Sequence, residues 1–405
     1  MSHSFLTPTK VIRAAMAEFQ NNLSFVKQCK KLAMKDYEIG GMKAGSAINA
    51  AVPNNFAVTT ASATFSGQDL NERSVSVPVD NQYHVDLNGI STLEWTMNID
   101  DFSQRFLKPA MSNLAAKVEQ KMLDIAAKGA GSYAGAAATT PNTALVYLQA
   151  GQKLTELSAP LDGRSVHINP AANAATVDAL KALFADQRQL GAQYTKGLMG
   201  NAFGFDFYTN QAIPVIACGT RTASSSVTVK TTVSTEGATT IVLSGTTGCT
   251  YTAGDMFTIA DVYAVNPLTK QSTGALAQFV VTALATAGTT GTYDATVTVK
   301  TPMYSTGGHQ NISAFPQATA AVTFLGTAST SYPRNIYTCQ DAVAFANVEL
   351  QVPGGVDFAA AETVEGISLR VVRYYTGSSD TISTRFDVAF GGAVLRPEWV
   401  GQLIG

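Results

Sequence analysis

The sequence is poor in charge. Only 14% of its 405 residues are Asp, Glu, Lys or Arg, whereas 46% are hydrophobic. A surface with so few charges is a solubility liability for a free monomer, so the composition indicates that neighbouring subunits cover much of it. The formal net charge of −2 excludes a strongly basic nucleic-acid-binding protein, and any contact with nucleic acid is expected to be local and nonspecific.

Cysteine, histidine and long apolar runs are scarce as well. No CxxC pair occurs and no histidine lies at metal-ligand spacing, so we expect reduced, buried thiols and neither a metal nor a cofactor. The amino-terminal stretch lacks the apolar run of a signal peptide, and no stretch approaches the length of a membrane span. We therefore expect folding in a cytoplasm without a membrane partner. The four cysteines are Cys29, Cys218, Cys249 and Cys339.

Motifs for catalysis are missing too. No Gly-Lys dipeptide, GxSxG elbow or HExxH helix is present, and the run GAGSYAG follows a predicted helix instead of a strand, which is wrong for a dinucleotide site. The balance favours a structural or binding protein and not an enzyme. One enzyme alternative stays open, a hydrolase that uses Cys218 or Cys339 with His309.

The amino-terminal region predicts an amphipathic helix that begins at Thr7-Pro8. Its apolar stripe continues at spacings of three and four, through Ile12, Met16, Phe19, Leu23 and Val26. The other faces are locally basic, and a solvated face is favoured there over a DNA-contacting arm. These basic side chains include Lys27, Lys30, Lys31 and Lys35.

Residues 45–88 predict an extended hairpin. Val75, Val77 and Val79 alternate with polar residues, and YHVDL repeats this pattern at positions 83–87. Such a hairpin buries little of itself, so we expect it to lie on a partner. Its polar tip comprises Gln68, Asp69, Asn71, Glu72 and Arg73.

A long helix is predicted over 101–128, capped by Asp100 or Asp101, kinked or divided at Pro109 and ended by Gly129. Residues 129–140 then read as a linker. Two shorter helices are predicted over 143–157 and 172–189. Between them RSVHINP predicts a strand, with His167 on its polar side, and together these elements form an α+β unit.

Composition changes near residue 217. From there to about residue 333, short alternating runs rich in Thr, Ser, Gly, Ala and Val predict about half a dozen strands and no helix. Helix-and-strand character resumes at Asn335. We therefore predict an all-β, barrel-like or sandwich domain inserted into the α+β unit.

The stretch TRFDVAFGGAVLRPEW, residues 384–399, predicts a strand that is buried on one face. Phe386, Val388 and Phe390 alternate with polar or small residues, and the strand is expected to bend or bulge at its two glycines and to end at Arg396-Pro397. Arg385 and Asp387 would share one side of this strand. They could pair there, or they could form a simple solvated pair.

Two stretches resemble the coat proteins of tailed phages of the P22 type. In NIYTCQDAVAFANVEL, residues 335–350, the residues Asp341, Ala342 and Ala344 fit an Asp-Ala-Xaa-Ala helix start, while Cys339 departs from the family pattern. The ending resembles the family's strand with Arg-Xaa-Asp, then glycine, then Leu-Arg-Pro-Glu. The matching residues are Arg385, Asp387, Gly391, Leu395, Arg396, Pro397 and Glu398.

The resemblance implies an α+β, HK97-like capsid fold, and it assigns a part to each segment. The implied parts are an N-terminal arm (1–44), an E-loop (45–88), a P-domain with a spine helix (89–140), an A-domain (141–216 and 334–360), the inserted β domain (217–333) and C-terminal strands that complete the sheet (361–405).

The implied function is a major capsid protein whose hexamers and pentamers form an icosahedral shell around double-stranded DNA, with a scaffolding protein and a portal as partners. A tail-tube or decoration protein is the main alternative, and a secreted adhesin is disfavoured. Lys27, Lys30, Lys31 and Lys35 would be inner-face basic residues. Candidate subunit contacts are Asp69, Glu72, Arg73, Arg385, Asp387, Arg396 and Glu398.

Overall fold

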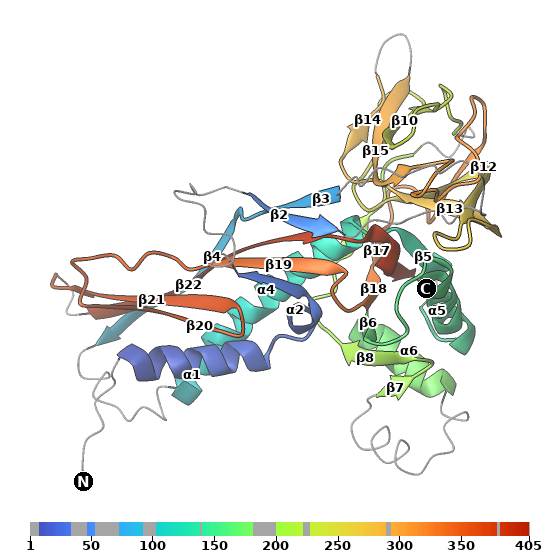
Figure 1. The fold of residues 1–405 in the computed structure, drawn as a ribbon. Helices are drawn as coiled ribbons and strands as arrows, with labels where there is room; N and C mark the ends of the chain where they lie inside the picture. The colour runs from blue at the N-terminus through green and yellow to red at the C-terminus, as the bar shows by residue number, and fades with distance from the viewer. Residues whose placement is uncertain are drawn as a thin grey trace, which may run out of the picture. The chain divides into compact units, whose positions relative to one another are not determined.

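The computed structural model describes residues 8–33, 47–52, 73–91, 103–137, 140–180, 200–221, 227–288, 293–378 and 381–404. The chain forms two compact units (Figure 1). The first contains residues 1–50, 75–122 and 344–393, and the second contains residues 51–74, 123–343 and 394–405. Helices and strands are interspersed, so the expected α+β class is confirmed.

A six-stranded sheet dominates the first unit, in the order β1-β19-β22-β21-β20, with β4 also paired to β22. Helix α1 lies along β20 and β21 and buries Ile12, Ala15, Met16 and Phe19 (Figure 1). The strands are β1 (Lys30–Ala33), β4 (Asn81–Ser91), β19 (Val343–Val348), β20 (Phe358–Val364), β21 (Ile367–Thr376) and β22 (Thr381–Val394).

The amino-terminal helix is shorter than its apolar stripe predicts. Helix α1 (Pro8–Asn21) begins at the expected proline, but a four-residue helix, α2 (Phe25–Gln28), and strand β1 follow it. Leu23 and Val26 are buried nonetheless. The break arises because the backbone N–H groups at the start of α2 donate to the carboxylate of Glu119, which lies on a distant helix.

That distant helix is α4 (Lys108–Lys128), preceded by a π-helical turn, η3 (Ser103–Leu107). The change from π to α geometry falls beside Pro109, so the expected division of the helix there is confirmed. The helix ends immediately before Gly129, also as predicted. Asp100 and Asp101 lie outside the described residues.

The two predicted strands of the 45–88 hairpin pair with other partners. Strand β3 (Arg73–Pro78) pairs with β2 (Ala47–Val52), whereas β4 pairs with β22. In β4 the predicted faces are correct, since Tyr83, Val85 and Leu87 are half-buried and His84 and Asp86 are exposed. The pairing was not predictable from period alone, because an alternating strand fits any sheet edge with a complementary face.

The second unit contains another six-stranded sheet, in the order β5-β23-β18-β6-β8-β7. Strand β5 lies in the segment predicted as a linker, and it pairs in parallel with β23. The strand was not predicted because glycine is typical of loops. Here Gly135 is required by close packing, since a Cβ at this position would overlap the carbonyl oxygen of Ile404. The strands are β5 (Ser132–Gly135), β6 (Arg164–Ile168), β7 (Asn201–Ala202), β8 (Phe205–Thr209), β18 (Asn335–Cys339) and β23 (Val400–Ile404).

Helices α5 (Ala144–Glu156) and α6 (Pro170–Leu180) belong to this unit, near the positions predicted for them. His167 does not lie on a polar face as predicted. All five residues of β6 are buried, and the His167 ring stacks on Tyr208 with centroids 5.2 Å apart. Alternation misled the prediction because a strand covered on both faces has no polar side.

Residues 227–324 form strands, and no helix occurs among those that the structure describes. A single core of Val, Ile, Phe and Tyr side chains holds them together. Pairings connect β10 with β15, β11 with β14, and β13, β12 and β16 in one sheet, so barrel closure stays a prediction. The strands are β10 (Ala238–Ser244), β11 (Thr250–Tyr251), β12 (Met256–Val265), β13 (Ser272–Val280), β14 (Ala285–Thr286), β15 (Asp294–Met303) and β16 (Val322–Phe324).

The chain enters and leaves this all-β region through paired strands. Strand β9 (Val215–Ala217) is antiparallel to β17 (Ser331–Pro333), with Ile216 opposite Tyr332. Strand β8 comes just before β9 in the sequence and β18 comes just after β17, and both β8 and β18 belong to the six-stranded sheet. The all-β region is therefore inserted between two strands of that sheet.

The segments that carried the family resemblance are strands. Asp341 and Ala342 form a turn and not a helix start, and β19 follows at Val343. Strand β22 continues through Gly391 and Gly392 to Val394, close to the predicted end at Arg396-Pro397, and the bend or bulge expected at the glycines stays a prediction. Glycine is needed at 391 for close approach, since a Cβ there would overlap the carbonyl oxygen of Pro78. Pro397 then begins a 3-10 turn, η4 (Pro397–Trp399).

Candidate subunit contact surfaces

One face of the sheet in the first unit carries an ionic cluster across three neighbouring strands. Arg370 of β21 lies opposite Asp387 of β22, which lies opposite His84 of β4. Two residues along β22, Arg385 lies opposite Asp86 of β4. Since residues i and i+2 of a strand share a face, these five side chains form one patch, which we call the Asp387 cluster.

Asp387 is the centre of this cluster, and its side chain is 0% exposed. Its Oδ2 accepts hydrogen bonds from Arg370 Nη2 at 2.7 Å and Nε at 3.1 Å, while Oδ1 accepts one from Arg385 Nε at 2.6 Å. Arg385 Nε also lies 4.0 Å from Asp86, and His84 lies 3.4 Å from Asp86. The pairing of Arg385 with Asp387 is therefore present within one chain. Sequence reasoning missed Arg370, because its strand partner is set only by sheet order.

The cluster leaves cationic groups at the surface. Arg385 is 37% exposed and Arg370 17%, whereas the carboxylate beneath them is covered. Arg370 Nη1 also donates to the carbonyl oxygen of Gln351 at 2.8 Å. The exposed guanidinium groups of this patch could donate hydrogen bonds to an acceptor on a neighbouring subunit. The role of the patch as a subunit contact stays a prediction.

The predicted basic residues are only partly described. Lys27 and Lys30 are exposed, and Lys31 is half-buried with its Nζ 3.9 Å from Glu365. Lys35 lies outside the described residues, as do Asp69 and Glu72. For Arg73 the backbone begins β3, and its side chain is likewise outside the description. The described side chains among them, those of Lys27, Lys30 and Lys31, belong neither to the Asp387 cluster nor to the pocket below.

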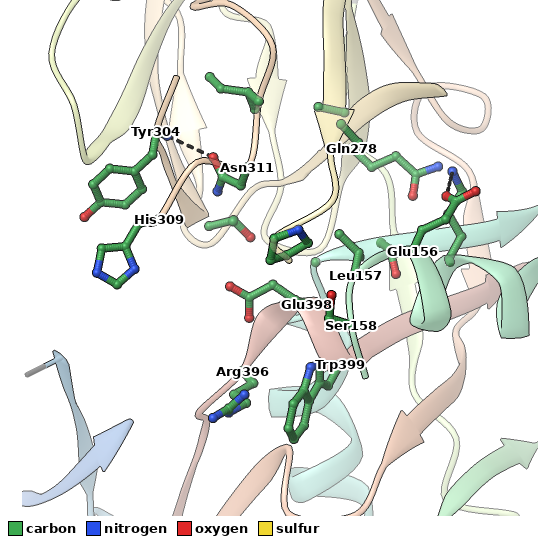
Figure 2. Close-up of a pocket in the computed structure, with 18 of the residues that line it drawn as sticks. Glu156, Leu157, Ser158, Gln278, Tyr304, His309, Asn311, Arg396, Glu398 and Trp399 are labelled. Atoms are coloured by element: carbon green, nitrogen blue, oxygen red, sulfur yellow. Dashed lines mark hydrogen bonds and ion pairs between the residues drawn. The ribbon is translucent and has the colours of Figure 1, made fainter. Parts of the chain in front are cut away.

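Arg396 and Glu398 line a pocket in the second unit, with a cavity volume of about 300 Å³ (Figure 2). The Arg396 guanidinium lies over the Trp399 ring, 4.0 Å from its centroid. The end of α5 forms one wall and residues of the all-β region form another. Sequence reasoning identified both charged residues but not the pocket, since its walls come from several segments that are far apart in the sequence.

A second buried carboxylate, Asp255, lies where the all-β region begins and ends. Its Oδ1 accepts a hydrogen bond from Arg221 Nη2 at 3.0 Å. Its Oδ2 accepts two from backbone N–H groups, of Gly219 at 3.0 Å and Thr252 at 2.9 Å. Arg221 and Asp255 are both buried. This carboxylate fixes the path of the connecting chain, a role that no local sequence pattern indicates.

The cysteines of the enzyme alternative are ordinary buried thiols. Burial raises the pKa of the Cys218 thiol, although Arg221 and Arg334 oppose the shift, and burial likewise raises the pKa of Cys339. All four cysteines are free and buried. A nucleophilic thiol needs a lowered pKa and access to substrate, so these positions do not favour a cysteine hydrolase.

Neither a metal site nor a membrane-spanning helix occurs among the described residues. No group of three or more His, Cys, Asp or Glu side chains could hold a metal ion there. Among the described helices, none combines the length and the apolar character needed to cross a membrane.

Comparison with protein families gives one match that spans nearly the whole chain. The family described as "P22 coat protein - gene protein 5" matches residues 9–405. Comparison with curated proteins gives no match.

Several solved structures are similar to this chain at low sequence identity. A chain of Mycobacterium phage Che8 is 11% identical over 94% of this chain and 90% of that chain, with a TM-score of 0.46. The capsid of cyanophage P-SCSP1u is 11% identical over 93% and 88%, with a TM-score of 0.45. The CUS-3 coat protein I-domain is 22% identical over 26% of this chain and 98% of that chain, with a TM-score of 0.19.

Proposed function

Since this chain belongs to the P22 coat protein family and is a phage major capsid protein that forms an icosahedral shell, we propose that the shell encloses double-stranded DNA and that the surfaces described above join its subunits. The family match over residues 9–405 is the observation that carries this proposal. The protein is thus a structural component of the virion, and we propose that it has no enzymatic activity and assembles in the host cytoplasm.

The proposed arrangement is HK97-like. Residues 45–88 act as the E-loop, α4 as the spine helix, the sheet around β18 as the core of the A-domain and residues 217–333 as the insertion domain. The paired strands β9 and β17 support an insertion, because they bring its two ends together. Copies of one chain then make heterologous contacts that close into rings and a shell, so individually modest contacts suffice.

The remaining partners follow from this function. A scaffolding protein would guide assembly and a portal would occupy one vertex. Packaged DNA would meet the shell only weakly, because a lining that neutralised many phosphates would resist packing and release. Exposed Lys27 and Lys30 are the described candidates for such weak contacts. A match to a coat protein family favours this function over the tail-tube or decoration alternative.

Negative-stain electron microscopy with light scattering tests the proposal on the expressed protein, with and without its genomic neighbours. We expect closed shells or ring-shaped capsomers. Deletion of residues 66–73 should leave the monomer's circular dichroism melt unchanged and abolish shells, while a Gly/Ser replacement of equal length separates loop chemistry from loop length. Stacked tubes from the parent protein would contradict the shell, and normal shells from the deletion would contradict only the E-loop assignment.

A further inference from the structure

The pocket of the second unit contains a carboxylate that forms no ion pair with the part of the chain that the structure describes. Glu398 has no hydrogen bond or ion pair with any residue that the structure describes, and its side chain projects into the middle of the pocket (Figure 2). The second acid in the lining, Glu156, is already paired with Lys153, whose Nζ lies 3.6 Å away. Glu398 is therefore the acid available to a ligand.

Ser158 adds a hydroxyl beside this carboxylate. Its Oγ is buried without a hydrogen-bond partner among the described residues, and Figure 2 shows it directed into the pocket next to Glu398. Its backbone is left-handed, with φ of 61°. Ser158 follows α5 at the position where glycine usually ends a helix, and Ala159 N–H donates to Leu154 O at 2.8 Å as such a cap requires.

Position 158 has a serine where glycine would be expected, because its backbone is left-handed. Glycine would form the same helix cap without strain, whereas serine accepts the strain and places a hydroxyl in the cavity. Strained positions and unsatisfied buried polar groups are both typical of binding sites. They point here to a polar ligand group that meets Ser158 and Glu398 together.

The remaining walls are apolar or already engaged. Leu157, Leu268 and Trp399 line the cavity, and Leu268 is 75% exposed in the isolated chain. The Arg396 guanidinium lies over the Trp399 ring, and the His309 ring lies 5.5 Å from that of Tyr304. The site thus combines one free acid with an apolar wall.

We propose that this pocket binds a cation on an apolar stem, an alkylammonium or alkylguanidinium group. The head group donates hydrogen bonds to the Glu398 carboxylate and Ser158 Oγ, and the methylene stem packs on Leu157 and Leu268. A lysine or arginine side chain of a second copy of this chain has this chemistry, and so does a free polyamine. The cavity volume of about 300 Å³ is at the lower end for small-molecule sites, which suits such a ligand.

Tryptophan fluorescence can measure this binding, because the chain has two tryptophans and one of them lines the pocket. In unassembled Trp95→Phe protein, Trp399 is the sole reporter. Titration with n-butylamine should give a saturable change, and n-butanol, which has the same stem without the charge, should bind about tenfold more weakly. Isothermal titration calorimetry provides a second measurement that does not depend on Trp399.

Two variants test the assigned contacts. Glu398→Gln should weaken n-butylamine binding about tenfold and leave n-butanol unaffected, whereas Glu349→Gln, at an exposed acid outside the pocket, should change neither. Ser158→Gly should weaken n-butylamine binding and raise the melting temperature, since it relieves a left-handed backbone. If Ser158 has only a structural role, Ser158→Gly should change the melting temperature and leave the affinity for n-butylamine unchanged.

Assembled shells distinguish the two sources of the cation. If a neighbouring copy supplies it, n-butylamine should no longer affect Trp399 in shells; if a polyamine supplies it, spermidine should compete with n-butylamine in shells and in free subunits. Equal n-butylamine affinity of the parent and Glu398→Gln, or no saturable binding by either method, would overturn the proposal. Neither result bears on whether shells form.

Discussion

Each of the two units buries one aspartate among its described residues, and the two carboxylates are held in different ways. Asp387 in the first unit is bound entirely by side chains, the guanidinium groups of Arg370 and Arg385 on β21 and β22. Asp255 in the second unit is bound by one guanidinium, of Arg221, and by two backbone N–H groups. Both carboxylates are 0% exposed.

This difference separates two uses of a buried charge. A carboxylate held by long side chains neutralises a sheet face and can be released at moderate cost, since partly exposed arginines return to water. A carboxylate that accepts backbone N–H groups determines where the chain runs, because those donors have no other partner once buried. Asp387 therefore shapes a surface, and Asp255 fixes the connection into the all-β region.

The largest effect is expected from Asp255→Ala. The substitution leaves Arg221 buried without its counter-ion and two backbone N–H groups without an acceptor, so the free energy of unfolding should fall by about 3–5 kcal/mol. Urea unfolding followed by circular dichroism measures it. Asp255→Asn keeps an oxygen for the backbone and removes the charge, so it should lose clearly less. Equal losses would show that the ion pair, and not the backbone contact, dominates.

A smaller loss, about 2 kcal/mol, is expected from Asp387→Ala. Water can reach Arg385 and Arg370 after the change, because both are already partly exposed. The same urea series measures it, with Asp86→Ala as the matched control on the exposed rim of the cluster, where the loss should be below about 1 kcal/mol. The comparison fails if Asp387→Ala costs as much as Asp255→Ala.

The smallest effect on the free energy of unfolding depends on pH. It comes from His167, a side chain that is buried in its neutral form. Burial lowers the pKa of His167 to about 3. The unfolded chain takes up the proton near pH 6.5 and the folded chain does not, so stability is complete above that pH. It falls by up to about 1.4 kcal/mol for each pH unit below it. Between pH 7 and 5.5 the parent should lose about 1 kcal/mol more than His167→Gln; parallel profiles would show that His167 does not titrate on unfolding.

Sequence reasoning succeeded where one face of an element meets water. The alternation in β4 identified the half-buried face with Tyr83 and Val85, and the start of α1 and the end of α4 followed from Pro8 and Gly129. It failed where both faces are covered. Strand β19 is almost entirely buried and rich in alanine, so nothing in its pattern distinguished it from a helix start.

The candidate site shows the same limit. Arg385, Asp387, Arg396 and Glu398 could be selected from the sequence, because they match the closing motif of the family that the chain resembles. Their partners could not be selected, since Arg370 and Ser158 come next to them only through sheet order and helix capping. Spatial neighbours supplied by long-range pairing leave no local signal.

The place of β23 has a consequence for biosynthesis. This strand lies inside its sheet, between β5 and β18, although it is translated after both. Until the ribosome has released residues 400–404, β5 has no partner strand in the sheet and β18 has one unpaired edge. The all-β region, which lies between β5 and β18 in the sequence, has a core of its own. A nascent chain thus holds a folded insert on an unfinished sheet, and that interval is when exposed strand edges are most open to mispairing or to protection by a chaperone.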